Sequence, residues 1–387
     1  MEGTRRSPDI WLFAITVALL VIGIFMVFDA SYARAGQVKY TGGDSYFFVK
    51  RQAVFAIMGL IAMFIAQRIR FWKLKPYGAA FLMLTIIGLA AVLAVGRNAG
   101  GATRWIGYGS INIQPSEFAK LALVLYLANL LTRPRFDITD FQTGLIPAMI
   151  PIGIIAVLVM AEPDMGTTIV TCATGVVLVY ISGARRSHMA LIMVSAVVLG
   201  IILIITEPYR MSRLTSFTDP FASYHGDGYQ VCRSLIGLGS GGPLGVGLCE
   251  GREKIFYLPA EHTDFILAVL GEEMGLIGTM GLATLFLLFA VRGYHIAKKT
   301  KDNFGKLLAV GLTSLISGQA LLNMLVVTST VPATGVPLPF ISYGGSSLML
   351  NLMSVGILLG ISQYPDGGND ENRPYRRRHR RSRVPRR

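Results

Sequence analysis

Long apolar runs recur about ten times along this chain and constrain its fold more than any other sequence feature. Each run can cross roughly 30 Å of hydrocarbon, where only a helix satisfies its backbone groups within the segment. The predicted spans cover residues 10–28, 52–66, 77–95, 115–131, 144–160, 166–182, 190–205, 264–291, 306–328 and 346–362. The composition agrees, because 52% of the residues are hydrophobic and only 15% are charged. We therefore predict an all-α polytopic membrane protein with about ten transmembrane helices.

Basic residues indicate how the spans are oriented. Alternation places residues 1–9, every second connection and the C-terminal segment on one face, which carries most of the Lys and Arg residues. The positive-inside rule therefore predicts that both termini are cytoplasmic. Residues 10–362 would form the membrane domain, with one large extracytoplasmic loop at 207–263. The first span has full length and no small-residue cleavage site, so it is predicted to be a signal anchor.

The composition changes after the last span. Residues 363–387 form an arginine-rich cytoplasmic tail with too little apolar content to fold alone. Beside a membrane helix, anionic lipid headgroups or an acidic protein fit such a tail better than nucleic acid does. The three cysteines give no metal framework, but Cys232 and Cys249 share the external loop, which leaves a disulfide there open.

The segment from Glu261 to Asp264 carries the strongest chemical signal. These polar residues run directly into an apolar run, so Asp264 would lie at the water–lipid boundary. An ionisable group in such a position is a functional candidate, because it is costly unless it is paired or faces water. Glu272 and Glu273 would follow roughly 12 Å deeper in the same helix. Two interpretations stay open for them, a functional acid pair and a hydrogen-bonded packing device.

Two further charged motifs lie at predicted helix starts. Glu117 and Lys120 are three residues apart and can pair on one helix face inside a polar cavity. Alternatively, Glu117 complements the helix dipole while Lys120 reaches outward to the headgroups. Asp164 lies in a tight external turn, where it can contribute to a site or simply cap the next helix.

Two irregular segments are predicted on the same external side. Residues 237–248 contain six glycines and form either a surface-folded lid or a flexible linker. Residues 331–348 contain three prolines and three glycines, and irregular backbone at membrane depth must be buried in protein or line a water-filled cavity. Ser342, Tyr343 and Ser346 would offer hydroxyl groups there to a sugar or a phosphate.

Basic side chains gather in the same external regions. Guanidinium and ammonium groups are common phosphate ligands, so we assign them to an anionic substrate such as a diphosphate. The candidates are Arg51, Arg104, Lys120, Arg213 and Lys254. With the carboxylates, they predict one external polar cavity rather than a proton path across the membrane, and no residue is assigned as a metal ligand.

Several long motifs together resemble one known family. They are GATRWIGYGSINIQPSEFAKLA, EPDMGT, SFTDPF followed by GYQ and SLIGLGSGG, LPAEHTDFILAVLGEEMG and TGVPLPFISYGGSSL. The chain resembles the SEDS family (shape, elongation, division, sporulation). Within it, the chain is more similar to the FtsW-like division and sporulation branch, with its SpoVE relatives, than to RodA. The resemblance covers nearly all of residues 10–362, in order.

The resemblance implies a ten-helix peptidoglycan glycosyltransferase in the bacterial cytoplasmic membrane that polymerises lipid II on the outer side. It also implies a monofunctional class B penicillin-binding transpeptidase and other division proteins as partners, and a location at the division septum. The family's essential aspartate falls on Asp264. Residues assigned to the substrate within matching motifs are Arg51, Arg104, Glu117, Lys120, Asp164, Gln230 and His262. Pro-Ala-Glu-His stands where Pro-Glu-Ala-His is usual, which leaves the role of Glu261 open.

The implied chemistry is an inverting displacement with release of undecaprenyl diphosphate. Asp264 would act as general base for an acceptor sugar hydroxyl, which needs a single carboxylate within hydrogen-bond reach. Cationic side chains or a divalent cation such as Mg²⁺ would stabilise the leaving diphosphate, and no organic cofactor is expected. Two rival functions stay open, a transporter that flips lipid II and a scaffold that recruits division proteins.

Overall fold

The computed structural model describes residues 6–99, 102–108, 111–206, 208–222, 224, 226, 228–259 and 261–367. Each of the ten predicted spans coincides with a helix, although several helices extend further than predicted. Among the described residues, eight helices are long and apolar enough to cross a membrane, and one shorter helix is also apolar. The predicted class, an all-α polytopic membrane protein, is confirmed, whereas ten crossings remain a prediction. Most of the arginine-rich tail, 368–387, lies outside the described residues.

The first half of the chain contains helices and one small sheet. The elements are α1 (Ile10–Ala35), α2 (Val38–Thr41), α3 (Phe47–Arg68), the 3-10 helix η1 (Phe71–Tyr77), α4 (Gly78–Val95), β1 (Arg97–Ala99), β2 (Ala102–Tyr108), β3 (Ile111–Ile113) and α5 (Pro115–Leu130). The three strands form an antiparallel sheet in the order β1-β2-β3, with Ile106 opposite Ile113. These short strands were not predicted, because they lie in the connection between two spans.

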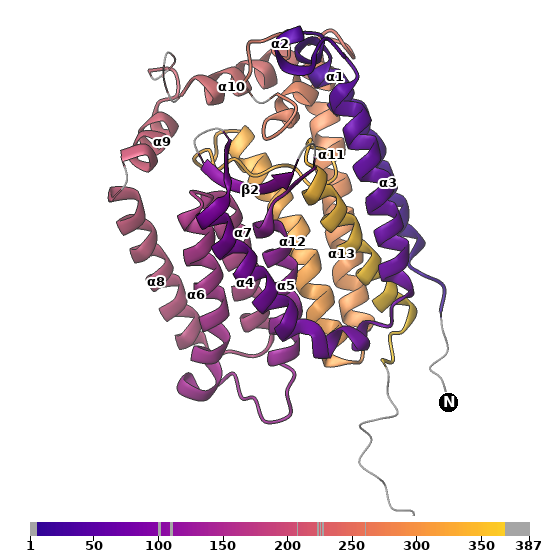
Figure 1. The fold of residues 1–387 in the computed structure, drawn as a ribbon, viewed down its shortest axis with the longest axis vertical. Coiled ribbons are helices and arrows are strands. Elements are labelled where there is room, and N and C mark those ends of the chain that lie inside the picture. Colours follow the sequence, from indigo (N-terminus) through magenta and orange to yellow (C-terminus); the bar gives the residue numbers. More distant parts are fainter. Residues whose placement is uncertain are drawn as a thin grey trace, which may run out of the picture.

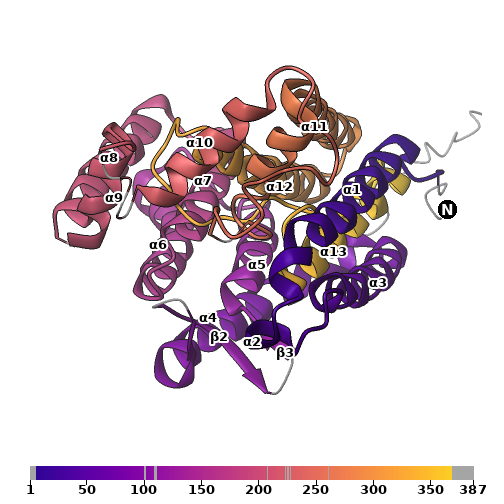
Figure 2. The same cartoon turned by 90° about the horizontal axis from the view of Figure 1, so that it is seen from above.

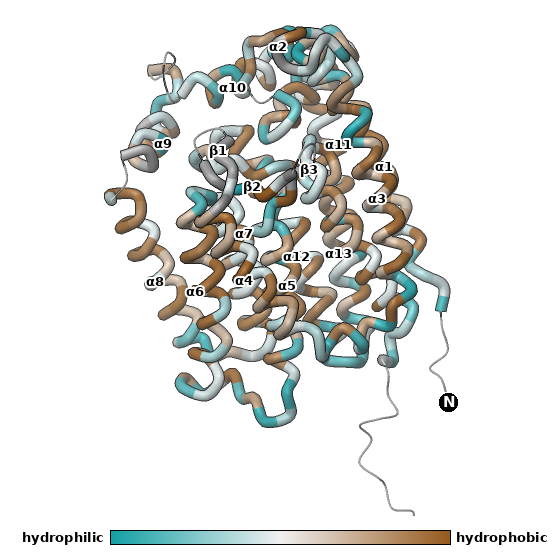
Figure 3. The backbone as a smooth tube through the Cα atoms, in the orientation of Figure 1, coloured by the Kyte–Doolittle hydropathy of each residue, from teal (hydrophilic) through white to brown (hydrophobic). Residues whose placement is uncertain are grey.

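The second half is helical throughout its regular elements. They are the π-helical turn η2 (Phe141–Leu145), α6 (Ile146–Ala161), α7 (Met165–Ile181), α8 (Arg186–Ile205), α9 (Pro208–Thr218), α10 (Tyr229–Gly241), α11 (Ile266–Lys299), α12 (Asn303–Val327) and α13 (Gly345–Gln363). The long helices stand side by side, and α9 and α10 of the large loop lie across one end (Figure 1). Hydrophobic residues line the helix shafts, while hydrophilic ones gather at the two ends (Figure 3).

The end of the bundle opposite α10 holds both ends of the described chain. The Arg6 N–H donates to the carbonyl of Gln363 at 3.0 Å, and Asp9 forms a 2.5 Å ion pair with Arg292. Both ends therefore lie on one side of the bundle, as the alternating topology requires. The assignment of that side to the cytoplasm rests on the distribution of Lys and Arg.

Burial is uneven across the bundle. The most apolar windows of α12 and α13 are 67% and 72% buried, against 11% for α8, which stands at the edge (Figure 2). α13 can pack tightly on α3 because Gly356 has no side chain. A Cβ at Gly356 would lie 2.3 Å from the backbone oxygen of Met63. From its central position, α12 contacts the segment before α11 and the irregular segment before α13.

α11 begins at Ile266, two residues later than the predicted start, and it is broken at Gly275. Gly275 has φ +63° and ψ −160°, a conformation that glycine adopts without a steric penalty. Glu272 and Glu273 precede this break, on the short first segment of α11. The predicted span at residues 264–291 therefore coincides with α11, but the kink at Gly275 inside it was not predicted.

Candidate active site

Asp264 lies in the short segment that joins the large loop at 207–263, predicted to be external and called the external loop below, to α11. Hydrogen bonds hold its backbone, since Asn323 Nδ2 on α12 donates to the Asp264 carbonyl at 2.7 Å. Ser342 Oγ donates to the carbonyl of Thr263 at 2.6 Å, and the Tyr343 N–H donates to that of His262 at 2.9 Å. The half-buried carboxylate of Asp264 itself has no hydrogen-bond donor within the described part of the chain. The protein thus fixes the residue while leaving its carboxylate available.

Charged neighbours from separate elements act on this carboxylate. Burial raises the pKa of Asp264 to about 6, and the negative charge of Asp164 acts in the same direction. The positive charges of Arg104 and Arg213 oppose the shift because they favour the ionised form, and the imidazole of His262 acts in the same direction. The structure therefore brings together five of the predicted site residues.

Arg104 on β2 holds the turn between α6 and α7. Its Nε donates at 3.1 Å to one backbone carbonyl of that turn, and a terminal nitrogen donates to the next. Asp164 in this turn caps α7, because its Oδ1 accepts from the Thr167 N–H at 3.0 Å and its Oδ2 from the Thr167 hydroxyl at 3.0 Å. The capping interpretation is confirmed. It is compatible with a place in the site, because the charge of Asp164 also acts on Asp264.

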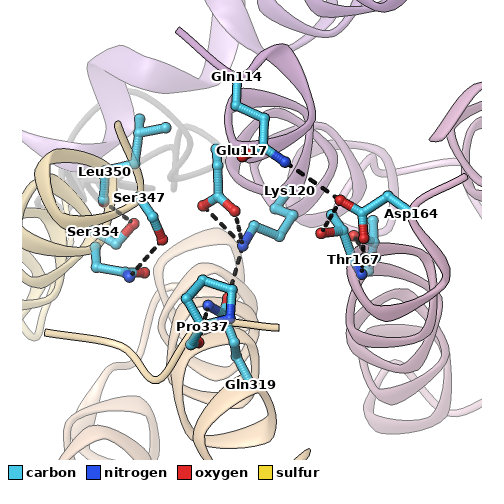
Figure 4. Close-up of polar contacts among 12 residues, drawn as sticks. Gln114, Glu117, Lys120, Asp164, Thr167, Gln319, Pro337, Ser347, Leu350 and Ser354 are labelled. Atoms are coloured by element: carbon cyan, nitrogen blue, oxygen red, sulfur yellow. Dashed lines mark hydrogen bonds and ion pairs between the residues drawn. The ribbon is translucent and has the colours of Figure 1, made fainter. Parts of the chain in front are cut away.

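Glu117 and Lys120 form a buried pair on α5 (Figure 4). Lys120 Nζ donates to Glu117 at 2.9 Å and to Gln319 Oε1 at 2.7 Å. Both charged residues are at most 4% exposed, so the paired interpretation is confirmed and the headgroup alternative for Lys120 is wrong. Gln319 Nε2 then donates to the carbonyl of Pro337 at 2.9 Å. The pair is thereby linked through α12 to the irregular segment before α13.

The Ser342 hydroxyl group of that irregular segment forms hydrogen bonds within the protein, which the sequence did not indicate. Ser342 Oγ accepts from the Leu338 N–H at 2.8 Å while it donates to the carbonyl of Thr263. The proton of this hydroxyl is therefore already donated within the protein, while its oxygen keeps a second lone pair, and the assignment of Ser342 to the substrate stays a prediction. Ser346 is also buried, in the first turn of α13.

Tyr343, His262 and Arg51 form an aromatic and basic group around Phe47 and Phe48 at the start of α3. The ring of Phe48 lies 4.6 Å from that of His262 and 5.1 Å from that of Tyr343, measured between centroids. Arg51 lies 5.4 Å over the ring of Phe47, and its positive charge also acts on Tyr343. Tyr343 and Arg51 are half-buried, whereas His262 is only 8% exposed. Direct substrate contact is thus easier for the first two.

Lys254 lies in a second polar cluster. Its Nζ is 2.5 Å from Asp29 on α1 and 2.5 Å from Glu273 on α11, and its side chain is 8% exposed. An ammonium group that is buried between two carboxylates is not available to a diphosphate. The assignment of Lys254 to the substrate is therefore corrected to a link between the external loop and the helices.

The two adjacent glutamates complete this second cluster. Glu272 accepts from the N–H groups of Arg252 at 2.7 Å and Glu253 at 3.1 Å. Glu273 accepts from the Cys249 N–H at 3.1 Å. Of the two interpretations left open, the structure supports the hydrogen-bonded packing device.

The glycine-rich stretch is folded onto the same helix. Gly237–Gly241 belong to α10, and a Cβ at Gly241 would lie 2.1 Å from the carbonyl oxygen of Gly271. Gly245 has φ +84°, and a Cβ there would lie 2.0 Å from the carbonyl oxygen of Glu273. The surface-folded interpretation therefore fits better than the flexible linker. Cys232 and Cys249 are both free, so the disulfide left open from the sequence is not formed.

Sequence reasoning missed the amides that organise the site and one buried acid. Gln319 and Asn323 lie four residues apart on α12, and Asn323 also donates to the carbonyl of Val336 at 2.8 Å. Two amides at this spacing in an apolar helix share a face, which is a signal the sequence did contain. Glu162 is fully buried, its carboxyl group accepts no hydrogen bond from the residues that the structure describes, and burial raises its pKa to about 8. It therefore keeps its proton at neutral pH.

No group of three or more His, Cys, Asp or Glu side chains in metal-binding geometry occurs within the described ranges. The carboxylates around Asp264 are divided between a helix cap, the Lys120 pair and the open Asp264 itself. Mg²⁺ does not require such a group of three, because it is usually bound through one or two carboxylates together with water and the phosphates of the substrate. The sequence-based expectation of a divalent cation stays a prediction.

Comparison with known proteins identifies the family. The family model described as cell cycle protein, which covers FtsW, RodA and SpoVE, matches residues 10–366. The chain belongs to this family. It is 40% identical to stage V sporulation protein E of Bacillus subtilis (strain 168) over 94% of this chain and 99% of that protein. It is 38% identical to a protein named probable peptidoglycan glycosyltransferase FtsW, from Geobacter sp. (strain M18), over 92% of this chain and 96% of that one.

Solved structures of similar proteins share the fold of this family member. One, described as structural coordination of polymerization and crosslinking by a peptidoglycan synthase complex, gives a TM-score of 0.76 at 25% identity. It covers 92% of this chain and 98% of that one. The rod shape determining protein RodA of Thermus thermophilus gives 0.68 at 24% identity, over 93% and 98% of the two chains, which shows the fold alone.

Proposed function

We propose that this chain is a peptidoglycan glycosyltransferase that polymerises lipid II into β-1,4-linked glycan and releases undecaprenyl diphosphate. The observation that carries the proposal is the Asp264 carboxylate, which is open while the backbone around it is fixed from α12 and from the segment before α13. The names of the FtsW relatives support the same activity, and they favour a role in septal synthesis during cell division.

In the proposed reaction, the Asp264 carboxylate accepts the proton of an acceptor sugar hydroxyl. The hydroxyl oxygen then attacks the anomeric carbon of the donor, and the bond from that carbon to the diphosphate oxygen breaks. The reaction inverts the anomeric configuration and needs one base. Arg104 and Arg213 supply positive charge beside Asp264, where it offsets the charge of the leaving diphosphate.

The proposed assembly includes a crosslinking partner. A structural relative of this chain acts in a complex that couples polymerization and crosslinking. We therefore assign a class B penicillin-binding transpeptidase as the partner, in the bacterial inner membrane at the septum, together with other division proteins. The arginine-rich tail fits anionic lipids on the opposite face of the membrane.

The direct test is polymerisation by the purified full-length chain. Lipid II is supplied in detergent with Mg²⁺ or with EDTA, and with or without a candidate transpeptidase blocked at its own active site. Glycan strands that are sensitive to a muramidase support the proposal, and the metal arms test the cation. Absence of polymer under all of these conditions, combined with lipid II movement across the bilayer in liposomes, would instead support a transporter.

A further inference from the structure

A polar and aromatic pocket lies in the external loop beside the candidate active site. Its volume is about 260 Å³, and it is enclosed by α9, α10 and the segment that follows α12. Residues that line it include Arg213, Phe217, Tyr229, Gln230, Val331 and Ala333. Neither the helix cap nor the buried Lys120 pair accounts for this pocket.

The pocket wall runs directly into the site. Arg213 lines the pocket, donates to the carbonyl of Ala333 at 2.7 Å, and acts through its charge on Asp264. Gly335 follows two residues later, and a Cβ there would lie 3.4 Å from Asp264 Oδ2. Two residues of chain span at most about 7 Å, so the pocket and the carboxylate are neighbours.

The lining suits a sugar ring rather than a lipid chain. A pyranose has faces of C–H groups and a rim of hydroxyl and amide groups. Phe217 and Tyr229 provide aromatic surface for such a face, while Arg213 and Gln230 provide polar groups for the rim. Both polar groups already donate to a backbone carbonyl, Arg213 to that of Ala333 and Gln230 to that of Pro259. Each has further N–H groups, from which a sugar rim can accept and a polyprenyl chain cannot.

We propose that this pocket holds a sugar of the growing glycan strand, from the disaccharide next to the one that reacts at Asp264, so that a single lipid II molecule leaves it empty. The inference rests on the proposed function. The pocket belongs to the external loop, on the side where a polymer must leave the membrane. Each incoming lipid II, in contrast, has only one disaccharide, and its lipid keeps that disaccharide close to the bilayer. Holding the strand between additions makes the enzyme processive, so the pocket controls strand length.

The test compares strand length with the rate of the first glycosidic bond. Tyr229→Ala removes an aromatic face, and Tyr229→Phe keeps it as the matched control. Val331→Trp fills the pocket, and Leu244→Trp places the same side chain at a loop position that is 77% exposed and outside the pocket. Each full-length variant is given lipid II in detergent. The tetrasaccharide product is timed, and the polymer lengths are resolved on a gel.

We expect Tyr229→Ala and Val331→Trp to shorten the mean strand about fivefold, because one aromatic contact to the held sugar is lost or blocked. The first bond should form at an unchanged rate, and both controls should give wild-type lengths. Wild-type lengths in both pocket variants would overturn the inference. A first-bond rate that falls in parallel with length, in variants with wild-type thermal stability, would also overturn it, since the pocket would then hold the reacting unit.

The two proposals can fail separately. If the wild-type chain makes no glycan, the proposed function fails before the pocket is tested. If it makes glycan and the pocket variants match it in strand length, only the assignment of the pocket fails. Should Val331→Trp not fold, Tyr229→Ala against Tyr229→Phe decides the question alone.

Discussion

Asn323 donates one hydrogen bond to the carbonyl of Asp264 at 2.7 Å and another to the carbonyl of Val336 at 2.8 Å. One amide on α12 therefore fixes the catalytic segment and the irregular segment before α13 relative to each other. Asn323→Asp keeps the size but cannot donate both bonds. We expect kcat to fall roughly 100-fold, because a displacement near 1 Å at a reacting group can have that effect. KM for lipid II should change much less, and a proportional rise in KM would contradict a positioning role.

The Glu117–Lys120 ion pair should affect the stability of the protein, because each buried charge needs the other to balance it. Glu117→Ala leaves the ammonium without its carboxylate, and Lys120→Ala leaves the carboxylate without its ammonium. Breaking a buried ion pair on one side costs about 3–5 kcal/mol of stability. The double variant Glu117→Gln/Lys120→Met should recover much of the thermal stability, measured in detergent, but not the activity. Wild-type stability in both single variants would show that the pair is not buried in the working protein.

The sequence predicted the helices well and the side-chain network poorly. Apolar runs of membrane length specify spans without reference to the rest of the fold, and the Glu117–Lys120 spacing specifies a local pair. Lys254 shows where local reasoning failed. Its two partners, Asp29 and Glu273, lie on α1 and α11, and no local pattern places these residues together. The hydrogen bond of Ser342 was not predicted for the same reason, because its acceptor is the distant carbonyl of Thr263.

Activity should depend on pH through Asp264. A general base must be ionised to accept a proton, so activity is lost as pH falls through the pKa of the base. Since that pKa is about 6 instead of the ordinary 3.8, kcat should rise between pH 5 and pH 7 and then level off. Arg213→Gln removes a positive charge that favours the ionised form, so the midpoint should move to higher pH. A pH–rate profile that is flat down to pH 4.5 in the wild type would contradict this assignment.

The polar cluster of Lys254, Asp29 and Glu273 should hold the external loop against α1 and α11. Lys254→Met leaves Asp29 and Glu273 buried together without a cation, at a cost of about 3–5 kcal/mol. We expect faster amide hydrogen exchange at residues 249–254 and a lower thermal midpoint. Adding Glu273→Gln to Lys254→Met removes one of the two negative charges and should restore part of both. If exchange in this segment does not change in Lys254→Met, the ion pairs do not retain the loop.

The central claim is that the open carboxylate of Asp264 is the general base. Asp264→Asn keeps the shape and removes the basicity, and Asp219→Asn makes the same change at an exposed position in the external loop. Both full-length variants are compared with the wild type for initial rates of lipid II polymerisation, at equal folded concentration in detergent. We predict that Asp264→Asn loses at least about 100-fold, the lower range for loss of a general base, while Asp219→Asn is unchanged. Polymerisation by Asp264→Asn at the wild-type rate would contradict the claim.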